Sequence, residues 1–314
     1  MSGPRKIVAL SGGVGGAKLA FGLDRALPAG ALSVIVNTGD DFTHLGLPIS
    51  PDIDTLLYTL SGLNDTRRGW GRAGESWAFM ETLRELGGED WFQLGDRDLA
   101  LHVLRGAMLA SGQDLTQVTA ALAARMGIAA KVLPMSDAPS PTLVETPDGA
   151  LEFQRYFVEQ RCAPVVTGLR HGAAAPSPAV LAALADPALA GIVICPSNPW
   201  LSIDPILALP GLSEALRASS APVVAVSPLV GGQAVKGPTA KIMAELGLPV
   251  TNASIAAHYA GLIDGLVIDR ADAGDAGALP LPVAVEETLM TDDARKIALA
   301  GRVLGFLDTL REGA

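Results

Sequence analysis

Cysteine and positive charge are both scarce in this 314-residue chain. Its two cysteines, Cys162 and Cys195, lie far apart and form no Cys-x-x-Cys motif, which argues against a disulfide scaffold and a zinc knuckle. Only 23 Lys and Arg residues stand against 33 Asp and Glu residues, which gives a net charge of -10. A surface without a broad basic field excludes a nucleic-acid partner, so any bound phosphate must be held by local contacts.

Long apolar runs are missing as well. The first run, Ile7 to Leu10, is too short for the core of a signal peptide, and no run reaches the roughly 20 apolar residues of a membrane-spanning helix. We therefore expect a cytoplasmic protein with no membrane partner. The composition, 49% hydrophobic and 18% charged, is sufficient to bury a large core.

Short apolar runs predict the strands of a sheet. They cover residues 6–10, 31–36, 191–196, 221–226 and 265–269. Continuous runs rich in Val and Ile are typical of strands buried on both faces, as in a parallel sheet covered by helices. We predict an α/β fold with a Rossmann-like, mostly parallel sheet and helices on both faces. Residues 1–61 and 185–314 form this nucleotide-binding core in the prediction.

An insertion is predicted between these two parts, at residues 62–184. Long Ala- and Leu-rich segments indicate helices between about 70 and 130, and Pro-Asp-Gly between two alternating runs in 141–160 indicates a β-hairpin. The insertion would form one wall of the site and a possible homodimer surface. Its tryptophans Trp70, Trp77 and Trp91 offer stacking surfaces, although aromatic residues at helical spacing more often belong to a core.

The segment SGGVGGAKL, residues 11–19, joins the first predicted strand to a helix. Free N–H groups at a helix N-terminus attract anions, and Gly12, Gly13 and Gly15 would allow a phosphate to approach the backbone. Lys18 is not followed by Ser or Thr as in a P-loop, and the spacing is not GxGxxG. A tight turn without a ligand is the alternative.

Four carboxylates follow the second predicted strand. Asp40 and Asp41 belong to NTGDDF, and Asp52 and Asp54 belong to SPDIDT. Ligands of open α/β sheets bind at the carboxyl ends of the strands, and magnesium is the cation that would neutralise such a cluster. We predict Asp40, Asp41 and Asp54 as magnesium ligands. The aspartates beside Pro51 could instead cap a helix.

Three further polar segments carry candidate site residues. PSNPW contains Ser197 and Asn198, VKGP contains Lys236 and Gly237, and WFQLGDRD contains Gln93 and Arg97. The first two follow predicted strands and should face the same crevice as the glycine segment. For the third, a capped helix with a surface ion pair is an equally simple interpretation.

In this order, SGGVGGAKL, NTGDDF, GLPISPDIDTLLYTLSG, GWGR, WFQLGDRDLALH, PSNPWLSIDPIL and SPLVGGQAVKGPTAK resemble the 2-phospho-L-lactate transferase family (CofD/FbiA type) of coenzyme F-420 biosynthesis. The resemblance implies a magnesium-dependent transfer to the side-chain hydroxyl of the deazaflavin Fo. The transferred group is a phosphorylated three-carbon acid, phosphoenolpyruvate or 2-phospho-L-lactate, which comes from its GDP conjugate with release of GMP.

The resemblance also assigns roles to single residues. Asp54 and Gln93 match positions that contact Fo in the family. We add Arg97 as a third predicted contact to Fo, because it could bind a phosphate, and we predict Asp41 and Asp54 as the carboxylates that orient or deprotonate the Fo hydroxyl. Position 93 is often basic in archaeal relatives and is Gln here. The donor pocket would comprise Gly12, Gly13, Gly15, Lys18, Asn37, Ser197, Asn198, Lys236 and Gly237.

Other functions compete with this interpretation. YvcK-type proteins of the same superfamily resemble nucleotide-sugar-binding regulators, but SPDIDTLLYTLSG followed by GWGR and LGDRD fits the transferases better. A nicotinamide-dependent dehydrogenase fits least well, since GxGxxG is missing. The sequence does not select among phosphoenolpyruvate, 2-phospho-L-lactate and 3-phosphoglycerate, which differ by few contacts, and we take phosphoenolpyruvate as the first choice.

Overall fold

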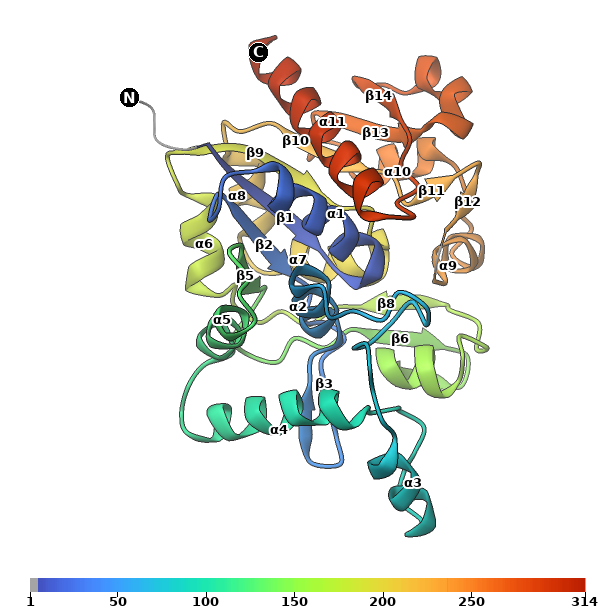
Figure 1. The fold of residues 1–314 in the computed structure, drawn as a ribbon. Coiled ribbons are helices and arrows are strands. Elements are labelled where there is room, and N and C mark those ends of the chain that lie inside the picture. Colours follow the sequence, from blue (N-terminus) through green and yellow to red (C-terminus); the bar gives the residue numbers. More distant parts are fainter. Residues whose placement is uncertain (1–4, 236, 314) are drawn as a thin grey trace.

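The computed structural model describes residues 5–235 and 237–313 (Figure 1). Its centre is a seven-stranded sheet in the order β14-β13-β10-β9-β1-β2-β5, in which all neighbours are parallel. The strands are β1 (Lys6–Ser11), β2 (Leu32–Val36), β5 (Lys131–Pro134), β9 (Leu189–Ile194), β10 (Val223–Val226), β13 (Gly265–Asp269) and β14 (Val283–Glu286). All five strands predicted from the sequence are confirmed.

The two edge strands, β5 and β14, were not predicted. Each has only four residues, and β5 ends in a proline, so neither stands out as an apolar run. β5 pairs with β2 although it lies inside the range 62–184 that we predicted as an insertion. Part of that range therefore belongs to the main sheet.

Helices cover both faces of the sheet because its strands are apolar on both sides. In β1, Ile7 and Ala9 pack into one core, whereas Val8 and Leu10 pack into the other. The first core includes α1 (Gly13–Ala26), α2 (Pro51–Ser61), α5 (Leu115–Arg125) and α11 (Asp293–Glu312), and the second includes α6 (Pro178–Leu184), α8 (Leu212–Ala218), α9 (Thr239–Glu245) and α10 (Asn252–His258). The Rossmann-like α/β class is thereby confirmed.

The order of the strands reverses between β1 and β9. From β1 the chain proceeds outward to β2 and β5, and it then returns to the other side of β1 with β9, β10, β13 and β14. The loops that leave β1 and β9 therefore diverge, which opens a crevice at their carboxyl ends. The glycine segment follows β1, and PSNPW follows β9.

A smaller unit projects from the sheet below α2 in Figure 1. It consists of the hairpin β3 (Phe42–His44) and β4 (Leu47–Ile49) with α3 (Ala78–Glu85) and α4 (Asp96–Ala110). Ile49, Met80 and Leu94 form its own small core. The inserted helices are therefore confirmed, and the hairpin β3–β4 is an addition.

The second hairpin confirms the turn predicted around Pro-Asp-Gly. β6 (Leu143–Thr146) and β7 (Gly149–Glu152) pair antiparallel, and β8 (Gly168–Arg170) adds a third strand. The remaining elements are η1 (Arg155–Glu159), η2 (Pro199–Ile203), α7 (Asp204–Leu207), β11 (Leu229–Val230), β12 (Gln233–Ala234) and η3 (Arg270–Ala278). Across the described ranges, no helix has the length and apolar character needed to cross a bilayer.

Candidate functional site

A cavity of about 680 Å³ lies at the carboxyl ends of the strands. Its wall includes the segments that follow β1, β2, β9 and β10, together with the first turns of α2 and side chains of α4 and η1. A volume of this size is typical of small-molecule and cofactor sites. The crevice expected from the strand ends is therefore a real cavity.

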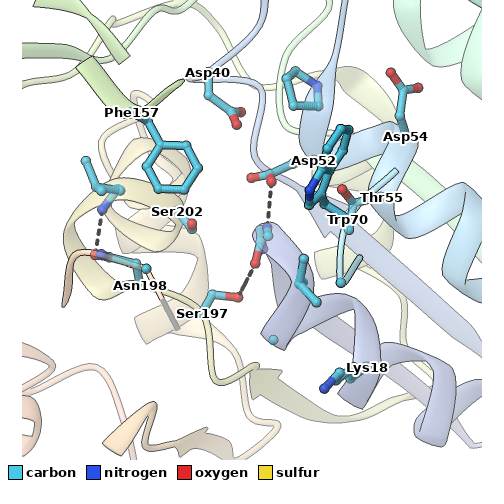
Figure 2. A pocket seen from close by; sticks show the side chains of 18 of the residues that line it. Lys18, Asp40, Asp52, Asp54, Thr55, Trp70, Phe157, Ser197, Asn198 and Ser202 are labelled. Carbon is cyan, nitrogen blue, oxygen red and sulfur yellow. Dashed lines mark hydrogen bonds between the residues drawn. The ribbon is translucent and has the colours of Figure 1, made fainter. Parts of the chain in front are cut away.

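The glycine segment forms one end of this cavity, and its first amides bind protein groups. Gly13 N donates to Asp52 Oδ1 at 2.6 Å, and Gly12 N donates to Ser197 Oγ at 3.1 Å (Figure 2). Asp52 therefore caps α1, the neighbouring helix, and not α2, to which it belongs. The next residues of the first turn of α1, Val14 and Gly15, line the cavity, and their amides have no acceptor within the helix, so they could bind an anion.

Close packing explains why glycines occupy this segment. A Cβ atom on Gly15 would lie 2.5 Å from the carbonyl oxygen of Pro196, and one on Gly12 would lie 2.6 Å from Asp52 Oδ2. Gly13 has a φ of +63°, which only glycine adopts without strain. The segment is therefore shaped first by its contacts with the loop after β9 and with α2.

Asp40 and Asp52 form a buried acid pair. The side-chain amide of Asn37 donates to both, at 3.1 Å to Asp40 Oδ1 and 3.0 Å to Asp52 Oδ2, and Gln154 donates to Asp40 Oδ2 at 3.2 Å. Burial raises the pKa of Asp52 to about 6, against the opposing effect of the hydrogen bonds from Asn37 and Gly13. Burial, together with the charges of Asp52 and Asp41, raises the pKa of Asp40 well above its usual range.

This pair fits one magnesium ion better than the predicted set does. Within the described ranges, no three His, Cys, Asp or Glu residues converge closely enough to form a metal site. Magnesium, however, is commonly held by one or two carboxylates together with water and substrate phosphate. Asp40 and Asp52 line the cavity, and a cation between them would offset the repulsion that raises the pKa of Asp40.

Asp41 and Asp54 lie apart from the acid pair. Asp41 is not part of the cavity wall, and its Oδ2 accepts a hydrogen bond from Ser50 Oγ at 2.7 Å. Burial raises its pKa well above the usual range, although Ser50 and Arg105 oppose this effect. Asp54 lines the cavity, but both of its oxygens bind Arg105, and Figure 2 shows its carboxylate turned away from Asp52.

The loop after β9 lies against the glycine segment. Ser197 Oγ donates to Gly12 O at 2.7 Å, and Asn198 Oδ1 accepts from the first amides of η2. Asn198 Nδ2 is buried and has no acceptor in the described part of the chain. Because Asn198 lines the cavity, this donor would suit an oxygen of a bound phosphate or ribose.

The other predicted donor contacts differ in their positions. Lys18 lines the cavity, and its Nζ donates to the carbonyl oxygen of Met290 at 2.9 Å. Gly237 also lines the cavity, whereas Asn37 supports the acid pair from behind the wall. Lys236 lies outside the described residues.

Aromatic side chains also form part of the cavity wall, and Figure 2 shows Phe157 near Asp40 and Trp70 near Asp52. Trp70, Phe92, Phe153 and Phe157 line the cavity, and Trp70 is 50% exposed. Trp77 and Trp91 do not line the cavity. Trp77 belongs to the small core of the projecting unit, and Trp91 packs against Phe42 with ring centroids 5.6 Å apart.

Of the two predicted Fo contacts on the projecting unit, only Gln93 reaches the cavity. Its Oε1 accepts from Arg84 at 2.9 Å, and its Nε2 donates to Asp90 O at 2.6 Å. Arg97 is exposed and does not line the cavity, since its position at the start of α4 directs it toward Gly74. The structure therefore does not bring Arg97 into the site.

Several residues in or directly behind the cavity wall were not among the predicted site residues. Asp52 was recognised in the carboxylate cluster but could equally have been a helix cap. Arg105, His102 and Tyr58 surround Asp54 from α4 and α2, and no local motif connects them with it. Tyr58 lies one turn after Asp54 on α2, whereas His102 and Arg105 come from α4, and only the packing of α4 against the β3–β4 hairpin and α2 brings these two to Asp54.

Comparisons with known proteins show which family the chain resembles. The family described as 2-phospho-L-lactate transferase CofD matches residues 7–297. A phosphoenolpyruvate transferase of Kitasatospora aureofaciens is 40% identical over 98% of this chain and 100% of the relative. A 2-phospho-L-lactate transferase of Methanosarcina acetivorans is 39% identical over 97% of this chain and 100% of the relative.

The fold also occurs in a solved structure. A protein of the UPF0052 family from Bacillus halodurans superposes with a TM-score of 0.61 at 18% identity, covering 96% of this chain and 99% of that chain. At this identity the likeness concerns the fold alone. The relatives reported above are transferases, and none of them favours the alternative of a nucleotide-sugar-binding regulator.

Proposed function

Because the chain belongs to the 2-phospho-L-lactate transferase CofD family, we propose that it transfers a phosphorylated three-carbon acid from its GDP conjugate to the deazaflavin Fo. The hydroxyl oxygen of Fo would attack the phosphorus that carries the acid. The new bond is an oxygen–phosphorus bond, the bond to the bridging oxygen breaks, and GMP leaves with that oxygen. The hydroxyl proton passes to a carboxylate or to solvent.

The observation that carries this proposal is the mixed polar and aromatic character of the cavity wall. One part offers the amides at the start of α1, the acid pair and the unpartnered donor of Asn198, which suit a diphosphate with its cation. Another part offers the rings of Trp70, Phe92 and Phe157, which suit a flat heterocycle. Asp54 follows Asp52 by two residues in the first turn of α2 and also lines the cavity.

The residues of the chain supply positioning and charge. Asp40 and Asp52 would hold a magnesium ion, which offsets negative charge on the diphosphate when it is bound. Asp54 would orient the acceptor hydroxyl and accept its proton, while Gln93, which also lines the cavity, would contact Fo. Asp41 does not line the cavity. It would contribute indirectly, by accepting the hydrogen bond of Ser50, the residue that precedes α2.

The expected acid is phosphoenolpyruvate. The Kitasatospora relative is named for this acid, but the Methanosarcina relative at almost the same identity is named for 2-phospho-L-lactate. Because the two sequence identities are almost equal, the identity of the transferred acid has to be measured directly. The cytoplasmic location and the homodimer remain predictions.

One assay tests the proposal. Purified protein, Fo and magnesium are incubated with the GDP conjugate of phosphoenolpyruvate, 2-phospho-L-lactate or 3-phosphoglycerate in turn, and products are read by mass spectrometry. We expect GMP and an Fo phosphodiester with one preferred acid, and loss of product in excess chelator. Absence of product with every donor would refute the proposed function, while full activity in chelator would refute the magnesium requirement alone.

A further inference from the structure

Arg105 is a charged side chain that is completely enclosed by the protein. Its exposed fraction is 0%, and it is the largest of the fully buried side chains among the described residues. Its guanidinium group binds Asp54 with two nitrogens, Nη1 to Oδ2 at 3.1 Å and Nη2 to Oδ1. A planar fork on both oxygens fixes the plane of the carboxylate, which a single point charge cannot do.

The guanidinium group is itself held from other elements. Nη1 also lies 3.4 Å from Pro48 O in β4 and 3.2 Å from His102 Nδ1, one turn earlier on α4. Arginine can only donate, so His102 Nδ1 must be the acceptor, and the ring proton is placed on Nε2. Nε2 lies 3.3 Å from Asp98 Oδ2, while Tyr58 donates to Asp98 Oδ1 at 2.5 Å.

The neighbours of Asp98, which are His102, Tyr58 and Arg105, keep negative charge on its carboxylate. Burial by itself would raise the pKa of Asp98, but hydrogen bonds from His102 and Tyr58 and the charge of Arg105 lower it below the usual value. Residues from α2, β4 and α4 are thereby joined around one guanidinium group. Arg105 has little freedom to turn, and neither does the carboxylate that it binds.

Stability alone is a poor explanation for this arrangement. The cost of removing two charges from water commonly cancels the attraction of a buried ion pair. The Nε atom of Arg105 is also buried without an acceptor among the described residues, which adds a further cost. The benefit is found at Asp54, which lines the cavity, whereas Arg105 does not.

We propose that Arg105 is a positioning residue of the transferase, which acts through Asp54 by fixing the orientation of its carboxylate toward the acceptor hydroxyl. The inference rests on the proposed function. It predicts that Arg105 contributes to turnover without contacting either substrate.

The test variant is Arg105→Lys, which keeps the charge and loses the fork. We expect kcat per folded molecule to fall at least about tenfold, because small misplacements of a reacting group are costly, while KM for both substrates stays within about threefold. Lys296→Met is the matched control, because it also removes a buried cation. Lys296 pairs with Asp293 on α11 and has no contact with Asp54. The kcat of this variant should be unchanged even if its melting temperature falls.

A double variant separates positioning from general loss of structure. If Arg105 acts through Asp54, Asp54→Asn combined with Arg105→Lys should turn over at the rate of Asp54→Asn alone, within about twofold. Losses that multiply would overturn the inference, as would a fully active Arg105→Lys. Should that variant fail to fold, His102→Leu, which removes the acceptor on Nη1 together with the contact of Nε2 to Asp98, must show the same dependence on Asp54 or the inference is wrong.

The two hypotheses fail in different ways. A folded wild-type chain that transfers none of the three acids refutes the proposed function, and the positioning role is refuted with it. An active wild-type chain with an equally active Arg105→Lys overturns the positioning role alone.

Discussion

The buried carboxyl of Asp52 should make the stability of the metal-free protein depend on pH in an unusual direction. Its pKa rises from the usual 3.8 to about 6 on folding, so the folded state holds the proton more strongly than the unfolded state. This contribution is fully present below pH 3.8 and is lost as the pH rises through 6. A shift of this size corresponds to about 3 kcal/mol of unfolding free energy.

Asp52→Asn tests this reasoning because asparagine cannot titrate. Its Oδ1 can still accept from Gly13, and the lost bond to Asn37 changes stability equally at every pH. Urea unfolding from pH 4 to pH 7.5 should therefore show the wild-type protein losing about 2.4 kcal/mol relative to the variant, because at pH 4 the unfolded carboxyl is already partly ionised. Groups that do not interact with Asp52 cancel in this difference. Asp40 does not, because the charge of Asp52 raises its pKa, so both proteins in the urea experiment should also carry Asp40→Asn.

Magnesium supplies the second half of the test. Above pH 6, magnesium at ten times its dissociation constant should restore about 1.4 kcal/mol to the wild-type protein and nothing to Asp52→Asn. Parallel pH curves for the two proteins would refute the raised pKa of Asp52. Equal stabilisation of both proteins by magnesium would refute Asp52 as a ligand.

Three further predictions concern the acceptor side and the assembly. Asp54→Asn should lower turnover by about 10²-fold per folded molecule, and wild-type rates in a folded variant would remove Asp54 from the reaction. Trp70→Ala should weaken Fo binding by about threefold to tenfold in a fluorescence titration. Trp77→Ala is its control, since Trp77 does not line the cavity, and equal losses in both would contradict the assignment. Ala124→Glu should shift a dimer toward monomer in light scattering, because Ala124 is exposed on α5, and an unchanged dimer would exclude this face. Ala121 is partly buried against the core, so a charge there would report on folding instead.

The sequence predicts the central sheet because its strands are continuous apolar runs, and it fails where elements are short. β3 and β4 have three residues each, and their turn places Leu45, a non-glycine residue, at a φ of +52°. Residue propensities do not predict a turn in which a leucine adopts a left-handed conformation. The segment FTHLGLPI was therefore not recognised as a hairpin, although it helps to place α4 beside α2.

The sequence predicts which segments form the site, but not which side chains in it bind each other. The sequence brings Asp40, Asp52 and Asp54 to one edge of the sheet, as observed. It does not show that Asn37 joins Asp40 to Asp52, or that Arg105 binds Asp54. These partnerships depend on side-chain directions across separate elements, which spacing along the chain does not determine.

The way Gly12, Gly13 and Gly15 are packed limits what this segment could do in another protein. Its conformation is created by Pro196, Ser197 and Asp52, which come from a different strand end and a different helix. Moving the sequence SGGVGGAK to another strand and helix would transfer its residues without the partners that give them this conformation. For engineers, the transferable unit is the three-segment junction, and a graft must move all three segments together.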